Sequence, residues 1–344
     1  MKRKSRSTSG GIQKKKSIWD DAKIIISKGC VIGVCGNKSL LTNIVLPYGV
    51  HTINHGSLNF CVNVTAVTLP ATLTSVERNS FKECDKLCSI TLPDSVTSVG
   101  YCSFENCTTL SSVTLPRFME KISNSLFSGC VNISFLQLPR SLTSVGNGAF
   151  KNCKGLTSLT LPNNVETIEG CAFLGCCGLV SIKFPKRLKT IHNSAFALCT
   201  GITRLKLPDM LTRLGDYVFD QCKNLTYLEL PHSLDNVGSS LFEGTALTSR
   251  SIIFRPRVSA AFITWAVGNS RKRANWQHTT VKRLRNVLRI ITTLALERRD
   301  VTTLDPDGCK NVFKGCDAWD GESTDSDSIV SNFSDHSVDV ISLV

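Results

Sequence analysis

The sequence predicts a repeat solenoid, in which equal coils of chain stack on one another. The pair Leu-Pro recurs nine times at identical steps of 23 residues, once with phenylalanine in place of leucine. Those leucine positions are Leu46, Leu69, Leu92, Leu115, Leu138, Leu161, Phe184, Leu207 and Leu230. A single globular core gives no reason for a fixed period over about 200 residues, whereas a stack of coils requires one.

Two further columns keep the same period and define the interior of the stack. The phenylalanine column comprises Phe81, Phe104, Phe127, Phe150, Phe173, Phe196, Phe219 and Phe242. The cysteine column comprises Cys61, Cys84, Cys107, Cys130, Cys153, Cys176, Cys199 and Cys222. Since no coil can bury its apolar face alone, neighbouring coils must stack.

Each repeat unit predicts one coil. It starts with alternating apolar and polar residues, as expected for a short strand, and proline ends that strand because it lacks an N–H. A second extended piece follows. The Ala-Phe-x-x-Cys part, for example residues 149–153, has the i, i+3 spacing of a single helical or 3₁₀ turn. The fold expected for this stretch is therefore a curved β-solenoid with short helical or 3₁₀ turns.

The repeat phrase LPxxLTSVGxxAFxxCxxLTSLTLP resembles the BspA-like class of leucine-rich repeats, and the likeness covers about residues 40–254. The resemblance implies a curved solenoid used for protein–protein or surface contacts. It implies no catalysis and brings no cofactor.

The cysteine column raises the question of thiol chemistry, because the chain has 16 cysteines. Free cysteine is small, readily buried and weakly hydrophobic, and threonine takes the same slot at Thr245. We therefore expect packing rather than disulfides, metal binding or nucleophilic catalysis. The pairs Cys30/Cys35 and Cys309/Cys316 lack zinc-knuckle spacing, and no catalytic motif is present. The sequence predicts no catalytic residue, no metal site and no enzyme activity.

A binding surface is predicted on the concave face, which the exposed residues of the first strands should line. The early coils present a ladder of Ser and Thr there, whereas later coils carry larger side chains. The candidate partner-binding residues are Phe135, Lys183, Arg204, Lys206, Tyr227 and Glu229. Tyr and Arg commonly dominate binding energy, so we expect a protein-interaction scaffold whose patch covers the last three coils. The alternative is a merely solvated face.

Charge is concentrated in the flanks of a chain whose formal net charge is +13. Residues 2–16 carry seven Lys/Arg and no acid, and residues 255–299 carry eleven basic residues against Glu297. Residues 317–344 carry seven acids and no Lys or Arg. The predicted organisation is a basic disordered tail (1–17), an N-terminal cap (18–39), the solenoid (40–254), a basic helical cap (255–300) and a largely disordered acidic tail (301–344).

Residues 258–298 predict a C-terminal helical hairpin, whose second helix places an apolar stripe opposite basic residues. These basic residues are Lys282, Arg283, Arg285 and Arg289. The hairpin can cover the last coil, or its basic face can bind nucleic acid or an anionic membrane, which gives the alternative function. The acidic tail can fold back on the basic flanks.

The location expected from the sequence is intracellular, in the cytoplasm or the nucleus. The charged N-terminus resembles no signal peptide, and no stretch reaches the roughly 18 apolar residues of a membrane span. Lys2-Arg3 and the lysines at 14–16 form a bipartite pattern typical of nuclear import.

Overall fold

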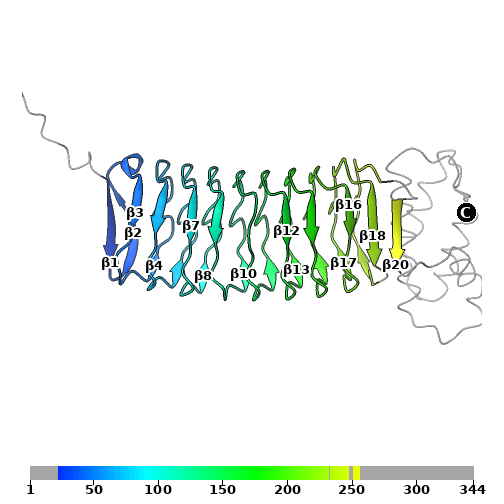
Figure 1. Cartoon of the computed structure of the whole chain (residues 1–344), viewed down its shortest axis with the longest axis horizontal. Helices are drawn as coiled ribbons and strands as arrows, with labels where there is room; N and C mark the ends of the chain where they lie inside the picture. The colour runs from blue at the N-terminus through cyan, green and yellow to red at the C-terminus, as the bar shows by residue number, and fades with distance from the viewer. Residues whose placement is uncertain (1–21, 232, 248–250, 256–344) are drawn as a thin grey trace, which may run out of the picture.

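The computed structural model describes residues 22–231, 233–247 and 251–255, which form an elongated stack of coils (Figure 1). Each 23-residue repeat makes one coil, so the predicted solenoid is confirmed. We number the coils from coil 1, residues 43–65, to coil 9, which begins at residue 227. The predicted hairpin at 255–300 and the tails at 1–17 and 301–344 lie outside the described residues.

The first strand of each coil pairs in parallel with its neighbours on one side of the stack. These strands are β3 (Asn43–Val45), β5 (Ala66–Thr68), β7 (Ser89–Thr91), β9 (Ser112–Thr114), β12 (Ser158–Thr160), β14 (Ser181–Lys183), β16 (Arg204–Lys206), β18 (Tyr227–Pro231) and β20 (Ile252–Arg255). They form sheets β3-β5-β7-β9, β12-β14 and β16-β18-β20, because residues 135–137 form no strand and β14 does not pair with β16. We call their exposed side the long-strand face.

A second, shorter strand in each coil forms the adjacent side. These strands are β4 (Thr52–Ile53), β6 (Ser75–Val76), β8 (Ser98–Val99), β10 (Lys121–Ile122), β11 (Ser144–Val145), β13 (Thr167–Ile168), β15 (Thr190–Ile191), β17 (Arg213–Leu214) and β19 (Asn236–Val237). They form two sheets, β4-β6-β8, which two N-terminal strands extend, and β10-β11-β13-β15-β17-β19, with a break between β8 and β10. We call this side the short-strand face.

The N-terminal end of the described stack is an antiparallel hairpin of β1 (Lys23–Ser27) and β2 (Cys30–Cys35). Strand β2 pairs with β4 and buries Val31 completely, so the hairpin continues the short-strand sheet. A 3₁₀ helix, η1 (Lys38–Leu40), leads into coil 1.

The third side of each coil is a run of turns, which we call the turn edge. As the i, i+3 spacing predicted, the N–H of seven column cysteines, from Cys84 to Cys222, donates to the carbonyl of the phenylalanine three residues earlier, at 3.1 Å for Cys153 and Phe150. No helix forms there, because each turn contains two residues with φ between 47° and 76°, four positions apart, such as Asn79 and Glu83. A left-handed residue cannot continue a right-handed helix.

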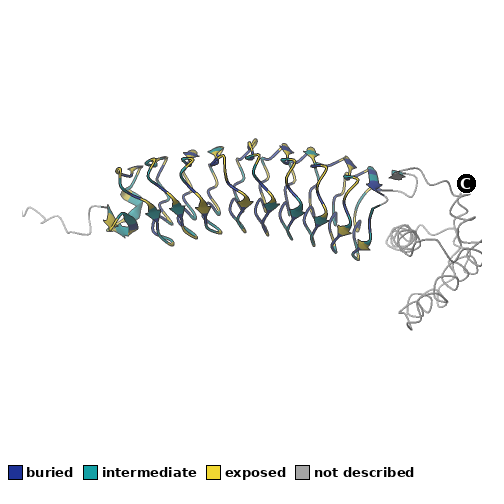
Figure 2. Ribbon diagram, turned by 90° about the horizontal axis from the view of Figure 1, so that it is seen from below, coloured by how far each residue is buried: buried dark blue, intermediate teal, exposed yellow. Residues whose placement is uncertain are grey.

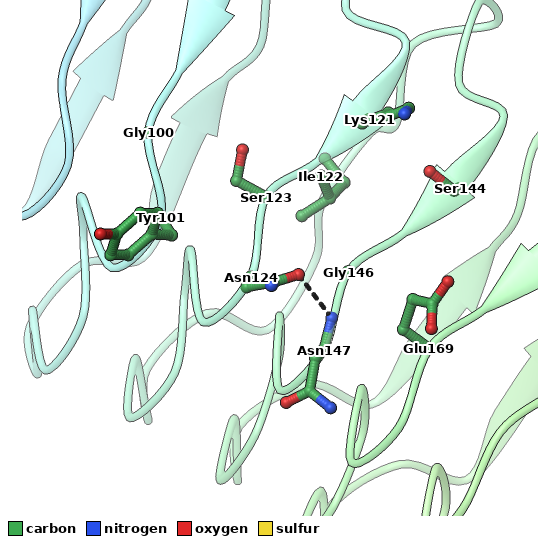
Figure 3. A pocket seen from close by; sticks show the side chains of 10 residues that line it. All are labelled: Gly100, Tyr101, Lys121, Ile122, Ser123, Asn124, Ser144, Gly146, Asn147 and Glu169. Atoms are coloured by element: carbon green, nitrogen blue, oxygen red, sulfur yellow. Dashed lines mark hydrogen bonds between the residues drawn. The ribbon is translucent and has the colours of Figure 1, made fainter.

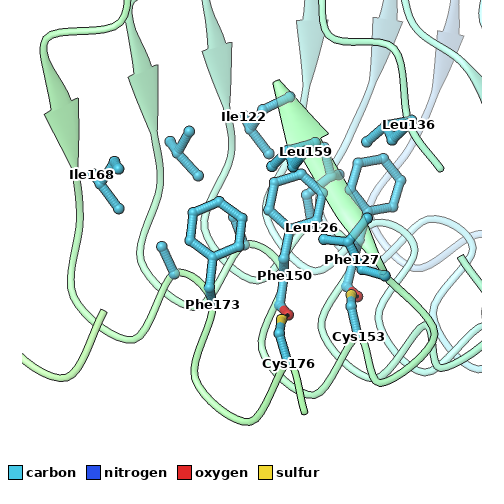
Figure 4. Packing of buried hydrophobic residues seen from close by; sticks show 14 of the residues in the cluster. Ile122, Leu126, Phe127, Leu136, Phe150, Cys153, Leu159, Ile168, Phe173 and Cys176 are labelled. Atoms are coloured by element: carbon cyan, nitrogen blue, oxygen red, sulfur yellow. Dashed lines mark hydrogen bonds between the residues drawn. The ribbon is translucent and has the colours of Figure 1, made fainter. Parts of the chain in front are cut away.

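The core is one continuous cluster along the stack, with exposed residues on its outside (Figure 2). Its centre is the phenylalanine column, whose neighbouring rings lie 5.1–6.0 Å apart with interplanar angles of 1–20°. Figure 4 shows Phe127, Phe150 and Phe173 side by side in this stack. Stacked aromatic pairs contribute about 0.5–1.5 kcal/mol beyond the area they bury.

The cysteine column is buried, as predicted, but its thiols also make hydrogen bonds. Seven of the eight donate to the phenylalanine carbonyl of the preceding coil or, in Cys84, to the equivalent leucine. The Cys153 Sγ lies 3.1 Å from the Phe127 oxygen, and Cys176 repeats the contact with Phe150 at 3.0 Å (Figure 4). The thiol is therefore both a small apolar filler and a link between coils.

Removal of one ring from the middle of the phenylalanine stack should destabilise the solenoid strongly. Phe150 is completely buried, so Phe150→Ala should lower the free energy of unfolding by about 3–5 kcal/mol through lost burial and a cavity. The measurement is urea denaturation followed by far-UV circular dichroism. Phe135→Ala is the control, because that ring is 67% exposed and its loss should cost less than about 1 kcal/mol. Equal losses in the two variants would contradict the assigned core.

Burial should make the stability of the solenoid depend on pH through the thiols. It raises the pKa of Cys107, Cys176 and Cys222 to about 12. An unfolded thiol ionises near pH 8.5, whereas these folded thiols stay protonated up to about pH 12. Between these two pH values, ionisation of the thiols favours the unfolded chain. The free energy of unfolding should therefore fall as pH rises, by up to about 1.4 kcal/mol per pH unit for each thiol.

Urea titrations between pH 8 and 10.5 measure this dependence. The control replaces the same three cysteines with threonine, the residue that the last coil carries at Thr245. Lysine and tyrosine ionise equally in both chains, so a smaller slope in the control isolates the thiols. Identical slopes would show that the column thiols do not contribute.

Candidate functional site

Four of the six predicted partner-binding residues lie together on the long-strand face of β16 and β18. The parallel register places Arg204 opposite Tyr227 and Lys206 opposite Glu229. In each strand the two residues flank a buried leucine, so strand alternation points all four side chains outward. We call Arg204, Lys206, Tyr227 and Glu229 the aromatic–charged cluster.

Side-chain contacts hold the aromatic–charged cluster together. The Arg204 guanidinium carbon lies 4.1 Å from the centroid of the Tyr227 ring, a cation–π geometry. The Tyr227 hydroxyl donates to Glu229 Oε1 at 2.9 Å, and Lys206 Nζ lies 3.6 Å from Glu229 Oε2. Arg204 and Lys206 remain exposed, whereas Tyr227 and Glu229 are half-buried. The cluster is thus a fixed arrangement with its two cations facing solvent.

The other two predicted residues lie apart from this cluster. Lys183 is exposed on β14, the next coil, but β14 and β16 do not pair. Phe135 belongs to coil 5, three coils from β16, in a segment that forms no strand. The structure therefore does not join these two residues to the four others.

The predicted basic flank, Lys282, Arg283, Arg285 and Arg289, lies outside the described residues. Its proposed binding to nucleic acid or an anionic membrane stays a prediction, as does the intracellular location. Within the described ranges, no helix is long and apolar enough to cross a bilayer.

Chemistry at the column cysteines is disfavoured by their surroundings. Burial raises the pKa of the thiols of Cys130, Cys153 and Cys199 well above the ordinary value, and reactivity requires the thiolate. All fourteen cysteines in the described ranges are free, and the eight of the cysteine column are buried, as the packing prediction requires. In the part of the chain that the structure describes, no three His, Cys, Asp or Glu side chains group as metal ligands.

A shallow groove on the short-strand face was not predicted. It holds about 550 Å³ and is open to solvent. Its lining comprises Gly100, Tyr101, Lys121, Ile122, Ser123, Asn124, Ser144, Gly146, Asn147 and Glu169 (Figure 3). The Asn147 N–H donates to Asn124 Oδ1 at 2.9 Å, which links two coils along the floor.

The groove lies where the short-strand sheet is interrupted. Strands β8 and β10 do not pair, and the Ser123 hydroxyl donates to the Val99 carbonyl across the break. Tyr101 follows Gly100, whereas the equivalent positions in the next two coils hold Asn124 and Asn147. This change of residue type is the only signal of the groove in the sequence. Periodicity alone does not reveal which coils lose their strand pairing.

Comparisons with known proteins agree with the observed fold. The chain is similar to the crystal structure of a leucine-rich repeat protein from Bacteroides ovatus, with 26% identity and a TM-score of 0.52, over 68% of this chain and 58% of that one. It is also similar to a leucine rich cell surface protein from Faecalibacterium prausnitzii, with 24% identity and a TM-score of 0.45, over 64% of this chain and 61% of that one. The chain thus spans about three fifths of the length of both proteins.

No curated protein matches the chain. A family model described as a BspA type leucine rich repeat region matches residues 34–157 and 143–259, in six copies. These matches cover well over half of the 344 residues and coincide with the stacked coils. The chain therefore belongs to the BspA-type leucine-rich repeat family.

Proposed function

We propose that this protein is a non-enzymatic interaction scaffold that binds a protein partner through the long-strand face of its last three coils. The observation that carries the proposal is the aromatic–charged cluster of Arg204, Lys206, Tyr227 and Glu229, in which neighbouring strands supply side chains that contact one another. The leucine-rich repeat solenoid is consistent with such a role.

The composition of the aromatic–charged cluster favours protein recognition. Arg and Tyr are enriched among residues that dominate binding free energy, whereas Ser and Thr are not. The equivalent positions in coils 2, 3 and 6 are small, for example Ser89 and Ser158. The long-strand face of the late coils therefore carries large and charged side chains, whereas that of the early coils carries mostly small, uncharged ones.

The internal contacts of the cluster also lower the cost of binding. A side chain that is already ordered loses less conformational entropy when a partner covers it. Tyr227 is held by Arg204 on its ring and by Glu229 at its hydroxyl. Support for a scaffold rather than a thiol enzyme comes from the burial of the column cysteines from Cys84 to Cys222, which raises the pKa of their thiols and keeps them protonated.

Replacement of Arg204 and Tyr227 together by alanine should weaken partner binding at least about tenfold, because each is a candidate hot spot worth more than about 1 kcal/mol. Partners captured by the full chain from native lysate are identified by mass spectrometry, produced separately and titrated against both chains. The matched control is Ser89→Ala with Ser158→Ala, which changes the same column in coils 3 and 6, outside the proposed face. Equal affinity of the double variant and the unmodified chain would refute the proposed face.

A further inference from the structure

Basic side chains gather on coils 7 and 8, on both sides of the bend after Pro185 and beside the aromatic–charged cluster. They are Lys183, Lys186, Arg187, Lys189, Arg204, Lys206 and Arg213, all exposed. We call these seven residues the basic strip. Residues 181–213 contain no other Lys or Arg and a single acid, Asp209, so this stretch has a net charge of +6.

The register of the coils gathers these charges on one surface. Lys183 and Lys206 occupy the same position in successive coils, and Thr190 pairs with Arg213 across β15 and β17. Paired strands lie about 4.8 Å apart, and although β14 and β16 do not pair, β15 and β17 keep these two coils adjacent. The positive charges of the two coils therefore repel one another unless anions neutralise them.

The neighbouring coils neutralise only part of the basic strip. Lys189 pairs with Glu166 at 2.8 Å, and Lys206 lies 3.6 Å from Glu229. Among the described residues, Lys183 and Lys186 make no side-chain hydrogen bond or ion pair, and Arg187 makes no ion pair but lies close enough to Glu166 to help lower the pKa of that carboxyl. The strip therefore has an excess of positive charge along the edge between its two faces.

The same chain contains a segment of the opposite charge. Residues 317–344 hold seven acids and no Lys or Arg. We propose that this acidic segment binds the basic strip of its own chain. The carboxylates would pair with Lys183 and Lys186, which have no ion-pair partner in the described structure, and with Arg187, which shares Glu166 with Lys189.

The length of the intervening chain permits this contact. Strand β20 pairs with β18 and β18 with β16, so the strip begins within about three coil steps, roughly 15 Å, of residue 255. The 61 residues from 256 to 316 would span about 90 Å even if they were entirely helical. Covalent linkage raises the effective concentration of the segment to about the millimolar range, which favours contacts that are individually weak.

Occupation of the basic strip would cover Arg204 and Lys206, which also belong to the aromatic–charged cluster. An acidic segment at this site would therefore compete with a protein partner for the same face. The intramolecular contact itself does not depend on the existence of that partner.

The test is carbodiimide cross-linking of the full chain, followed by peptide mass spectrometry. The reagent joins a lysine amine to a carboxylate as an amide and takes up the released water. We expect Lys183 or Lys186 to be linked to acids of 317–344 at about 20 mM salt, and the links to be lost at about 500 mM, where exposed charges are screened. A mixture of isotope-labelled and unlabelled chains shows whether each link lies within one chain.

Two charge-reversal variants make the test specific. Lys183→Glu with Arg187→Glu should reduce linkage at Lys186 at least about fivefold, because the local potential falls. Lys151→Glu with Lys154→Glu changes net charge equally on the turn edge and should leave linkage unchanged, with circular dichroism confirming that both variants fold.

Links from 317–344 only to lysines outside the strip, links only between different chains, or no links would overturn the proposal. Partner titration with Arg204→Ala and Tyr227→Ala is read independently. If the unmodified chain forms the expected cross-links but the double alanine variant binds the partner as tightly as before, only the proposed function is rejected. If the unmodified chain forms no such cross-links but the double alanine variant binds the partner more weakly, only the intramolecular contact is rejected.

Discussion

Backbone hydrogen bonds between adjacent coils fix the length of every coil. On the turn edge, alternate N–H groups donate to the next coil, as from Phe104 to Leu126 and from Phe150 to Ala172. An insertion or deletion of one residue would move every later side chain to the opposite side of its strand. The identical repeat length, the phenylalanine stack and the cysteine column all follow from this pairing.

The periodic part of the fold could be predicted because each coil repeats the same physical requirements. The strands, the bends at proline and the buried columns each require a particular residue type at a fixed spacing in the sequence. The positions with left-handed φ on the turn edge could not be predicted, because residues as different as Asn79, Cys102 and Leu198, as well as glycine, occupy them. The thiol hydrogen bonds were also missed, because the cysteine column looks the same whether its S–H groups donate or not.

The candidate site was predictable in position but not in geometry. Strand alternation placed Arg204 and Tyr227 on the exposed side, and register placed them on neighbouring coils. Whether the guanidinium covers the ring depends on rotamers, which the sequence does not encode locally. The groove beside Tyr101 was missed because it depends on a lost strand pairing between β8 and β10, while coil 4 keeps the ordinary repeat length. The aromatic–charged cluster and the groove therefore both arise from residues that differ between coils of the same length.

The interruptions of the two faces give coil 4 a mechanical role. Its first strand, β9, pairs only with β7 of coil 3, and its second strand, β10, pairs only with β11 of coil 5. Coil 4 is thus joined to each neighbour through a different sheet, while the turn edge keeps its bonds, as from Phe104 to Leu126. In a solenoid, whose stability is a sum of coil and interface terms, such a coil separates two cooperative blocks. The aromatic–charged cluster lies on coils 8 and 9 of the C-terminal block, whose coils are joined by the sheet from β10 to β19, so a change confined to coils 1 to 3 would leave the strand pairing around the cluster in place.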